Sequence, residues 1–280
     1  MQIKLRKKLV LVMTIALGVM YVVTAHATPV VISHGLTTAK IDDAGYFSGY
    51  SFAGREFIDY GTKSSNYSLN VNGSSVAIAD SVTGSNPLGA AVLASSASAV
   101  IIGNLEPVGG WTFLETVSIP VDGIVAFQIQ LTNNTGSTAT EVQWGIGFNP
   151  NQGIPSGSGF GTINTINATG GSVASVSAVS LDGWSITLAS MPSVFPVVPY
   201  IDLSNCCNPV DPGLMLATVQ AVGGYGFSDS SINLSYDLGT INALQTVTFG
   251  YTISVLPEPE TYAMLLVGLG LIGFSRRKSN

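Results

Sequence analysis

Charged residues are scarce in this chain: only 10 basic and 16 acidic residues occur among its 280, or 9%, against about 25% in a typical soluble domain. Lys and Arg are absent from residues 64–275, an interval with twelve Asp and Glu. This absence excludes a nucleic-acid binder, because nothing in the interval neutralises phosphate. The chain is nevertheless 46% hydrophobic, with a mean hydropathy of +0.43, which argues against charge-driven disorder.

Histidine and cysteine are scarce too, with two of each. His34 is the only histidine after residue 27, so any Ser-His-Asp system would have to use it. One histidine and two adjacent cysteines do not supply the spaced ligands of a zinc site. We therefore expect no catalytic triad, no metal site and no cofactor.

The first 27 residues have the layout of a secretory signal peptide. Four basic residues are followed by an apolar run over residues 9–23, and Ala25 and Ala27 form an A-x-A cleavage site. The apolar run is short for a membrane span of about 20 residues. We expect a signal peptidase to cut after Ala27, leaving a body of residues 28–256; the alternative is an uncleaved anchor.

The last 24 residues, 257–280, have a complementary layout. Pro257-Glu258-Pro259 is followed by an apolar run over 262–274 and then by Arg276, Arg277 and Lys278. This predicts a short transmembrane helix at about residues 261–275, with its basic tail 276–278 on the cytoplasmic side. The apolar run also contains a G-x-G-x-x-G sequence, but without the strand, helix and acid of a dinucleotide site.

This order of motif, glycine-containing helix and basic cluster resembles the PEP-CTERM sorting signal of Gram-negative bacteria. The resemblance implies a membrane-embedded exosortase that cleaves at or near Pro257-Glu258-Pro259 and releases the body toward the cell surface or an exopolysaccharide matrix. Before processing, the body would be periplasmic and held to the inner membrane by the helix. The alternative is an ordinary C-terminal anchor.

The body is strongly two-residue periodic, as expected for half-buried strands. The clearest alternation covers residues 125–131, 142–148 and 247–255. Together with many turn signals, it predicts an all-β fold, an antiparallel β-sandwich of hairpins. Lys commonly guards the edges of such sheets, so we expect Pro, isolated acids or binding partners to guard them here.

Three turn sequences predict strand register. Asn72-Gly73 and Asp182-Gly183 suit two-residue loops, whereas a three-residue loop at 121–123, with Gly123 left-handed in a bulge, gives the better pairing around Asp122. The implied pairs are Leu69 with Val76 and Tyr67 with Ile78; Leu181 with Trp184 and Val179 with Ile186; and Ile119 with Val125, Val117 with Phe127 and Phe113 with Leu131.

The remaining candidates for chemistry are weak. Glu56 and Asp59 lie among aromatics, which suits a sugar platform, but local pairing with Arg55 and Lys63 explains them equally well. The polar run 148–152 is either a simple turn or a ligand-facing loop. In an oxidising compartment Cys206 and Cys207 form a vicinal disulfide, a bridge between chains or free thiols, with the first preferred.

These observations favour an exported, non-enzymatic protein of the cell surface or extracellular matrix, with exopolysaccharide as a candidate partner. A carbohydrate-binding module or adhesin is the first alternative, and exposed aromatics at Trp111, Trp144, Trp184 or residues 46–60 would support it. A polysaccharide hydrolase using Asp and Glu is the second alternative.

Overall fold

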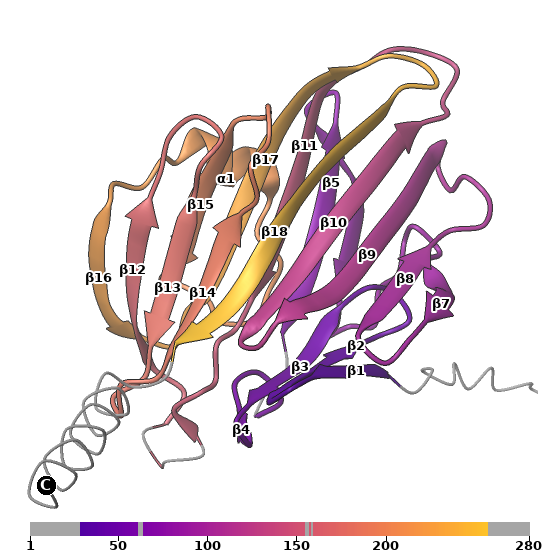
Figure 1. Cartoon of the computed structure of the whole chain (residues 1–280). Coiled ribbons are helices and arrows are strands. Elements are labelled where there is room, and N and C mark those ends of the chain that lie inside the picture. Colours follow the sequence, from indigo (N-terminus) through magenta and orange to yellow (C-terminus); the bar gives the residue numbers. More distant parts are fainter. Residues whose placement is uncertain (1–28, 61–63, 155–156, 158, 257–280) are drawn as a thin grey trace, which may run out of the picture.

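The structure is a computed structural model that describes residues 29–60, 64–154, 157 and 159–256. The predicted signal peptide and the whole C-terminal signal lie outside these residues. Within them, no helix is long and apolar enough to cross a membrane. The described residues form the all-β, antiparallel architecture that the sequence predicts (Figure 1).

The larger layer is a nine-stranded antiparallel sheet. The alternating segments 125–131 and 247–255 lie in two of its central strands, as predicted. In spatial order its strands are β16 (Gly223–Ser228), β12 (Thr162–Ala168), β13 (Ser175–Val179), β14 (Ser185–Ser190), β18 (Thr246–Leu256), β10 (Ile124–Asn133), β9 (Trp111–Val121), β8 (Ala99–Gly103) and β7 (Ala91–Ser95).

Two smaller sheets form the other layer. One is a five-stranded sheet and the other a four-stranded sheet of N-terminal strands, which lies beneath the lower ends of β9 and β10 in Figure 1. Their strands in order are β15 (Val197–Asp202), β17 (Ser231–Ile241), β11 (Ala139–Phe148), β5 (Ser65–Val71) and β6 (Ser74–Asp80); and β1 (Val30–His34), β2 (Thr37–Ile41), β3 (Phe47–Phe52) and β4 (Arg55–Glu56).

Stacked aromatic rings join the two layers. The ring centroid of Trp144 in β11 lies 5.0 Å from that of Tyr67 in β5 and 5.6 Å from that of Phe113 in β9. The three rings are nearly parallel. Phe47 of β3 meets Phe127 of β10 edge-on at 5.5 Å. Such pairs add about 0.5–1.5 kcal/mol each beyond their buried area. All three sheets therefore share one hydrophobic core.

The outer face of the five-stranded sheet is covered by the segment between β15 and β16. This segment contains a six-residue helix, α1 (Pro212–Ala217), which Asp211 caps at its N-terminus. Beneath it, Ser68 and Ser235 donate hydrogen bonds to carbonyls of Val210 and Pro212. Our sequence analysis did not predict α1, because six residues are too few for a helical apolar stripe.

The register predicted around Asp122-Gly123 is confirmed beyond the turn. Val117 pairs with Phe127 and Phe113 with Leu131, and Gly123 has a φ of 78°. The predicted loop length is wrong, because Val121 pairs with Ile124 across a two-residue loop. The bulge lies next to this loop in β9, where Ile119 and Pro120 are opposite Val125 alone.

The register predicted from Asn72-Gly73 is wrong. The turn itself is the expected two-residue loop, but Val76 is an extra residue in β6, so Leu69 pairs with Ala77 and Tyr67 with Ala79. Val76 and Ile78 are consequently 50% and 42% exposed. The small alanines face the core instead, which leaves room for the Tyr67 ring on Trp144.

The Asp182-Gly183 register is also wrong. Ala178, rather than Val179, pairs with Ile186, and the Ser180 amide donates to the Trp184 carbonyl at 3.0 Å, which closes a three-residue loop. The Ser180 hydroxyl also donates to Asp182 within the turn. Leu181 is thereby left 61% exposed at the loop tip.

The four edge strands of the two larger sheets are guarded without lysine. Three carry an extra residue that interrupts the edge: Leu93 in β7, Val76 in β6 and one of Tyr225–Gly226 in β16. β15 has Pro199, and the Gln220 side chain bonds both the amide and the carbonyl of Ile201, at 2.8 and 3.0 Å. Bulges, which our expectation omitted, are the main device that interrupts these edges.

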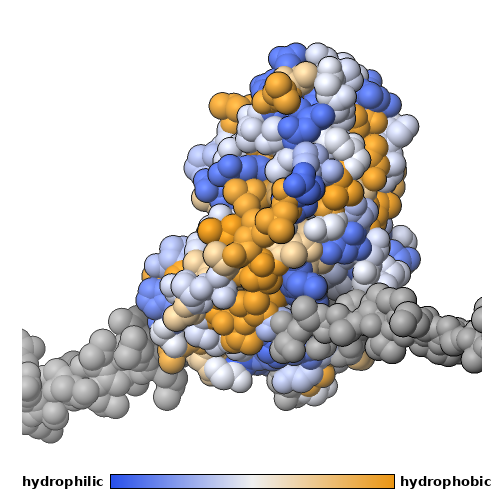
Figure 2. Space-filling model, turned by 90° about the vertical axis from the view of Figure 1, so that its right-hand side faces the viewer, coloured by the Kyte–Doolittle hydropathy of each residue, from blue (hydrophilic) through white to orange (hydrophobic). Residues whose placement is uncertain are grey.

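A hydrophobic band nevertheless marks the side of the molecule where β7 lies (Figure 2).

Replacing Gln220 tests this guard. Gln220→Ala removes two hydrogen bonds from the β15 edge, each worth about 0.5–1.5 kcal/mol net. We expect urea unfolding to show a loss of about 1–2 kcal/mol, and light scattering to show concentration-dependent association. Gln130→Ala, on an exposed position of the interior strand β10, is the matched control. An unchanged stability and an unchanged mass for Gln220→Ala would contradict this role.

Candidate functional site

Glu56 is a turn-forming residue. Its Oε1 accepts hydrogen bonds from the amides of Tyr50, Phe57, Ile58 and Asp59, at 2.8–3.2 Å. Tyr50 and Phe57 are fully buried and thus cannot serve as a sugar platform. Glu56 is therefore held by the backbone amides of its own turn, whereas Arg55, one of its expected partners, pairs with Asp182.

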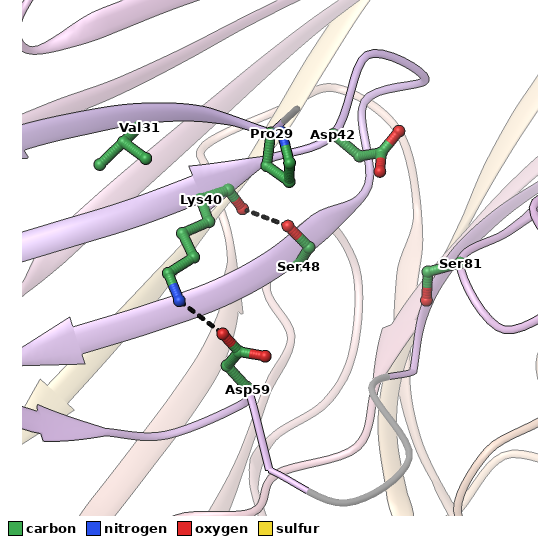
Figure 3. A pocket seen from close by; sticks show the side chains of 7 residues that line it. All are labelled: Pro29, Val31, Lys40, Asp42, Ser48, Asp59 and Ser81. Atoms are coloured by element: carbon green, nitrogen blue, oxygen red, sulfur yellow. Dashed lines mark hydrogen bonds and ion pairs between the residues drawn. The ribbon is translucent and has the colours of Figure 1, made fainter. Parts of the chain in front are cut away.

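Asp59 pairs with a different cation from the one expected. Its Oδ2 lies 2.5 Å from the Lys40 ammonium. The pair lines a pocket of about 420 Å³ beside the four-stranded sheet, which also contains one further carboxylate and two hydroxyls (Figure 3). The lining residues are Pro29, Val31, Lys40, Asp42, Ser48, Asp59 and Ser81.

Lys40 is a charged group in this pocket. The hydrogen bond that Lys40 donates to Asp59 is the main reason that the pKa of Lys40 is raised above its ordinary value, against a smaller opposing effect of burial. An ammonium with a raised pKa keeps its proton at neutral pH, so it cannot act as a general base or nucleophile. The pocket is thus suited to binding a polar or charged group.

Arg55 joins the four-stranded sheet to the β13–β14 turn. Its guanidinium lies 2.7 Å from Asp182, stands 5.3 Å from the Trp184 ring centroid and donates to the carbonyl of Gln152. Arg55 was expected to pair near Glu56 and Asp59, but it reaches a turn more than a hundred residues away in the sequence. These contacts of Arg55 with Asp182, Trp184 and Gln152 are structural, because they hold the four-stranded sheet to the β13–β14 turn.

The polar run 148–152 is a buried connector. Asn151 donates to the Tyr60 carbonyl at 2.5 Å, and Gln152 donates to the Ala178 carbonyl at 2.8 Å. Asn149, Asn151 and Gln152 are each at most 2% exposed. This burial favours the turn interpretation over a ligand-facing loop.

The aromatic residues named from the sequence do not form an exposed platform. Trp111 and Trp144 are 3% and 0% exposed, and Trp184 is covered in part by Arg55. Sequence reasoning missed Phe160 and Phe227, which are 46% and 52% exposed. A signal for them was present in Phe160-Gly161, because the missing side chain of Gly161 makes room for the Phe227 ring.

Cys206 and Cys207 are joined in a vicinal disulfide in the segment that covers the five-stranded sheet. The Cys207 carbonyl accepts a hydrogen bond from the Ser64 hydroxyl at 2.8 Å, and Asn149 Nδ2 lies 3.7 Å from Cys207 Sγ. The bridge therefore lies at the end of β11 and contributes to fixing the cover.

His34 lies apart from any catalytic arrangement. Its Nδ1 is 3.0 Å from the Ile119 carbonyl, to which it donates. Within the described part of the chain, no cluster of three His, Cys, Asp or Glu side chains could hold a metal ion. The predicted cleavage residues Ala25 and Ala27 and the sorting residues Pro257, Glu258, Pro259, Arg276, Arg277 and Lys278 lie outside the described residues.

Glu115 is a buried acid that the sequence did not single out. It is 2% exposed, and its Oε2 has no hydrogen-bond partner among the described residues. Burial raises the pKa of Glu115 to about 8, although a hydrogen bond from Tyr251 opposes the shift. A raised carboxyl pKa often marks an active site, but Glu115 faces the closed core and cannot reach a substrate.

The C-terminal residues supply the decisive comparison: residues 255–279 match the description "PEP-CTERM protein-sorting motif". The chain carries a PEP-CTERM sorting signal. This confirms the resemblance drawn from Pro257-Glu258-Pro259 and the basic cluster. It identifies a sorted, exported protein with a membrane-directed signal, and implies processing by an exosortase. No curated protein matches the chain.

Solved structures resemble the body of this chain at very low identity. A putative aldose 1-epimerase from Escherichia coli K12 has 11% identity and a TM-score of 0.50, covering 82% of this chain and 99% of its own. An aldose epimerase homologue from C. elegans has 7% identity and a TM-score of 0.49, covering 81% and 98%. A polysaccharide lyase has 12% identity and a TM-score of 0.46, covering 80% of this chain but 33% of its own. At 11% identity, the likeness to the putative epimerase shows a similar fold and nothing of the chemistry.

Glu115 makes stability depend on pH. Between pH 4.5 and about 8 the unfolded chain ionises Glu115 while the folded chain keeps the proton, so the free energy of unfolding falls as pH rises through this window. The summed effect of this shift, from 4.5 to about 8, is on the order of 5 kcal/mol at 1.36 kcal/mol per pKa unit. We expect urea unfolding at pH 5, 6.5 and 8 to show that the free energy of unfolding of Glu115→Gln increases relative to that of the native chain as pH rises.

The exposed Glu106 provides the control, since Glu106→Gln should leave the pH profile unchanged. Parallel profiles for the native chain and Glu115→Gln would show that Glu115 is not neutral in the folded state.

Proposed function

We propose that this chain is a non-enzymatic protein of the cell surface or extracellular matrix, delivered there through its PEP-CTERM signal. The observation that carries the proposal is the match at residues 255–279. The A-x-A site ending at Ala27 supports export, because a signal peptidase would free the other end. The body between these ends is an acidic sandwich.

Processing would follow from the order of the C-terminal elements. The basic tail 276–278 remains on the cytoplasmic side and the apolar run 262–274 enters the inner membrane, so the body lies in the periplasm. Pro257-Glu258-Pro259 would then lie at the periplasmic surface of the inner membrane, within reach of a membrane-embedded exosortase. Cleavage there releases the body.

The carboxylates of the body support a role other than catalysis. Asp122 accepts from the amide of Leu36 and the hydroxyl of Thr37, Asp182 pairs with Arg55, and Asp211 caps α1. Acid catalysis of glycoside cleavage needs two carboxyl groups about 5–10 Å apart across a cleft. These three carboxylates, like Glu56, are engaged in holding turns and joining sheets.

Sorting is tested by tagging both ends of the body. A tag after Asn280 should be absent from the surface-released form, while an internal tag in the body remains. Glu258→Ala should leave the tagged chain in the inner membrane, and Glu260→Ala, two residues away, is the matched control. Recovery of the C-terminal tag at the surface, or equal release of both variants, would overturn the proposed route.

Carbohydrate binding is a second candidate, favoured by the exposed apolar pair Ile163 and Phe227. Ile163 of β12 pairs with Phe227 of β16 and both are exposed, so their side chains share one face. An apolar surface of this kind can receive the CH face of a sugar ring. Thr165 and Asn167, at alternate positions beyond Ile163, would supply polar groups.

Glycan arrays followed by titration of purified residues 28–256 test this candidate. Phe227→Ala should weaken binding about tenfold or more, because burying a Phe ring is worth about 1.5–3 kcal/mol. Leu105→Ala, which removes another exposed apolar side chain (85% exposed), should bind as the native body does. Absence of binding to every glycan, or equal loss in both variants, would remove the candidate.

A further inference from the structure

The body ends directly at its C-terminal signal. β18 continues as a strand through Leu256, and the signal begins at Pro257. Tyr262, the first residue of the apolar run, follows Leu256 by only six residues, which span at most about 20 Å at about 3.3–3.6 Å each. A chain whose apolar run lies in the inner membrane therefore holds the end of β18 within about 20 Å of the bilayer.

Two turns of the nine-stranded sheet lie beside this end of β18. Ser185 pairs with Leu256, so the β13–β14 turn lies beyond the last residue of β18. The Val255 amide donates to the carbonyl of Gly123, in the β9–β10 turn, at 3.0 Å. Figure 1 shows the ends of β13, β18 and β9 together along the lower edge of the sheet.

These turns present large apolar side chains to solvent, and so does the β1–β2 turn. Leu181 in the β13–β14 turn is 61% exposed, Val121 beside the β9–β10 turn 51%, and Leu36 in the β1–β2 turn 61%. The Leu36 amide donates to Asp122 at 2.8 Å, which holds the β1–β2 turn against the β9–β10 turn. Turns usually carry Gly, Asn, Asp or Ser. We call Leu36, Val121 and Leu181 the apolar rim.

The shape and charge of this end suit a broad, flat partner. The strands from β13 to β9 are four spacings of about 4.8 Å apart, so the apolar rim extends about 20 Å across the sheet. The carboxylates of the same turns are engaged within the fold, since Asp122 also accepts from the Thr37 hydroxyl and Asp182 pairs with Arg55. Their engagement lowers the cost of approaching anionic headgroups.

We propose that the apolar rim is a membrane-contact surface, which lies on the periplasmic side of the inner membrane while the chain is joined to its signal. Its partner is a phospholipid bilayer, whose headgroup–acyl boundary receives apolar side chains. This contact turns Pro257-Glu258-Pro259 toward the membrane, where an exosortase acts. The inference rests on the membrane insertion in the proposed function. Cleavage removes the tether and its high effective concentration of lipid, so the body then leaves the surface.

Fluorescence quenching tests the contact in the full-length chain, reconstituted in vesicles of phosphatidylethanolamine and phosphatidylglycerol. Cys206 and Cys207 are joined, so a thiol-reactive fluorophore labels only an introduced cysteine. A label on Leu181→Cys should be quenched by phospholipids that carry a nitroxide at the headgroup. Leu244→Cys is the matched control: Leu244 is 76% exposed, but it precedes β18 and lies about 35 Å away along that strand. Its label should escape quenching.

Removing the rest of the apolar rim separates lipid contact from simple tethering. Leu36→Ser combined with Val121→Ser should lower the ratio of docked to free body by about tenfold or more, because two side chains lose their transfer out of water. Quenching at position 181 should fall with it. The control pair Val76→Ser and Leu105→Ser removes apolar side chains that are 50% and 85% exposed elsewhere, and it should leave the quenching unchanged.

An alkaline carbonate wash of the vesicles checks membrane insertion separately. A chain that the wash removes would overturn the proposed route and the contact with it. A retained chain whose labels at positions 181 and 244 are quenched alike, or whose quenching at 181 survives loss of Leu36 and Val121, would overturn the contact alone. So would quenching at 181 that requires an exosortase in the same vesicles, because the partner would then be a protein.

Discussion

The stack of Tyr67, Trp144 and Phe113 is the contact on which the two-layer arrangement depends. Tyr67 and Trp144 come from adjacent strands of the five-stranded sheet, and Phe113 comes from the nine-stranded sheet. Parallel rings at 5.0–5.6 Å require both sheets to keep their register and spacing. The stack thereby explains the alanines that face the core in β6: a larger residue at Ala77 or Ala79, opposite Leu69 and Tyr67, would crowd the stack.

The scarcity of basic residues imposes a second constraint, on the sheet edges. A body without Lys after residue 63 cannot use the commonest device against edge-to-edge pairing. The chain instead places an extra residue in β6, β7 and β16, and it covers β15 with Gln220. These devices act through backbone geometry and neutral hydrogen bonds, so they hold at any salt concentration.

Sequence reasoning predicted the strands well and the pairing only in part. Alternation depends on side chains within one strand, and the segments 125–131, 142–148 and 247–255 are strands as predicted. Pairing depends also on bulges. The extra residue Val76 moves the partners of Leu69 and Tyr67 one position along β6, to Ala77 and Ala79. A bulge leaves little trace in the sequence when the residues on either side are Val, Ala and Ile, all acceptable on either face.

The prediction of which charged residues pair with one another failed for a different reason. Chain proximity suggested that Glu56, Asp59, Arg55 and Lys63 would pair among themselves, whereas Lys40 and Asp182 are the partners that the fold supplies. Both ion pairs hold the four-stranded sheet, one to the segment that follows β4 and one to the β13–β14 turn. Among the described residues, the N-terminal sheet is thus the part of the body that both ion pairs hold. Ion pairs therefore contribute to holding this sheet in place, whereas the two larger sheets meet through the aromatic stack.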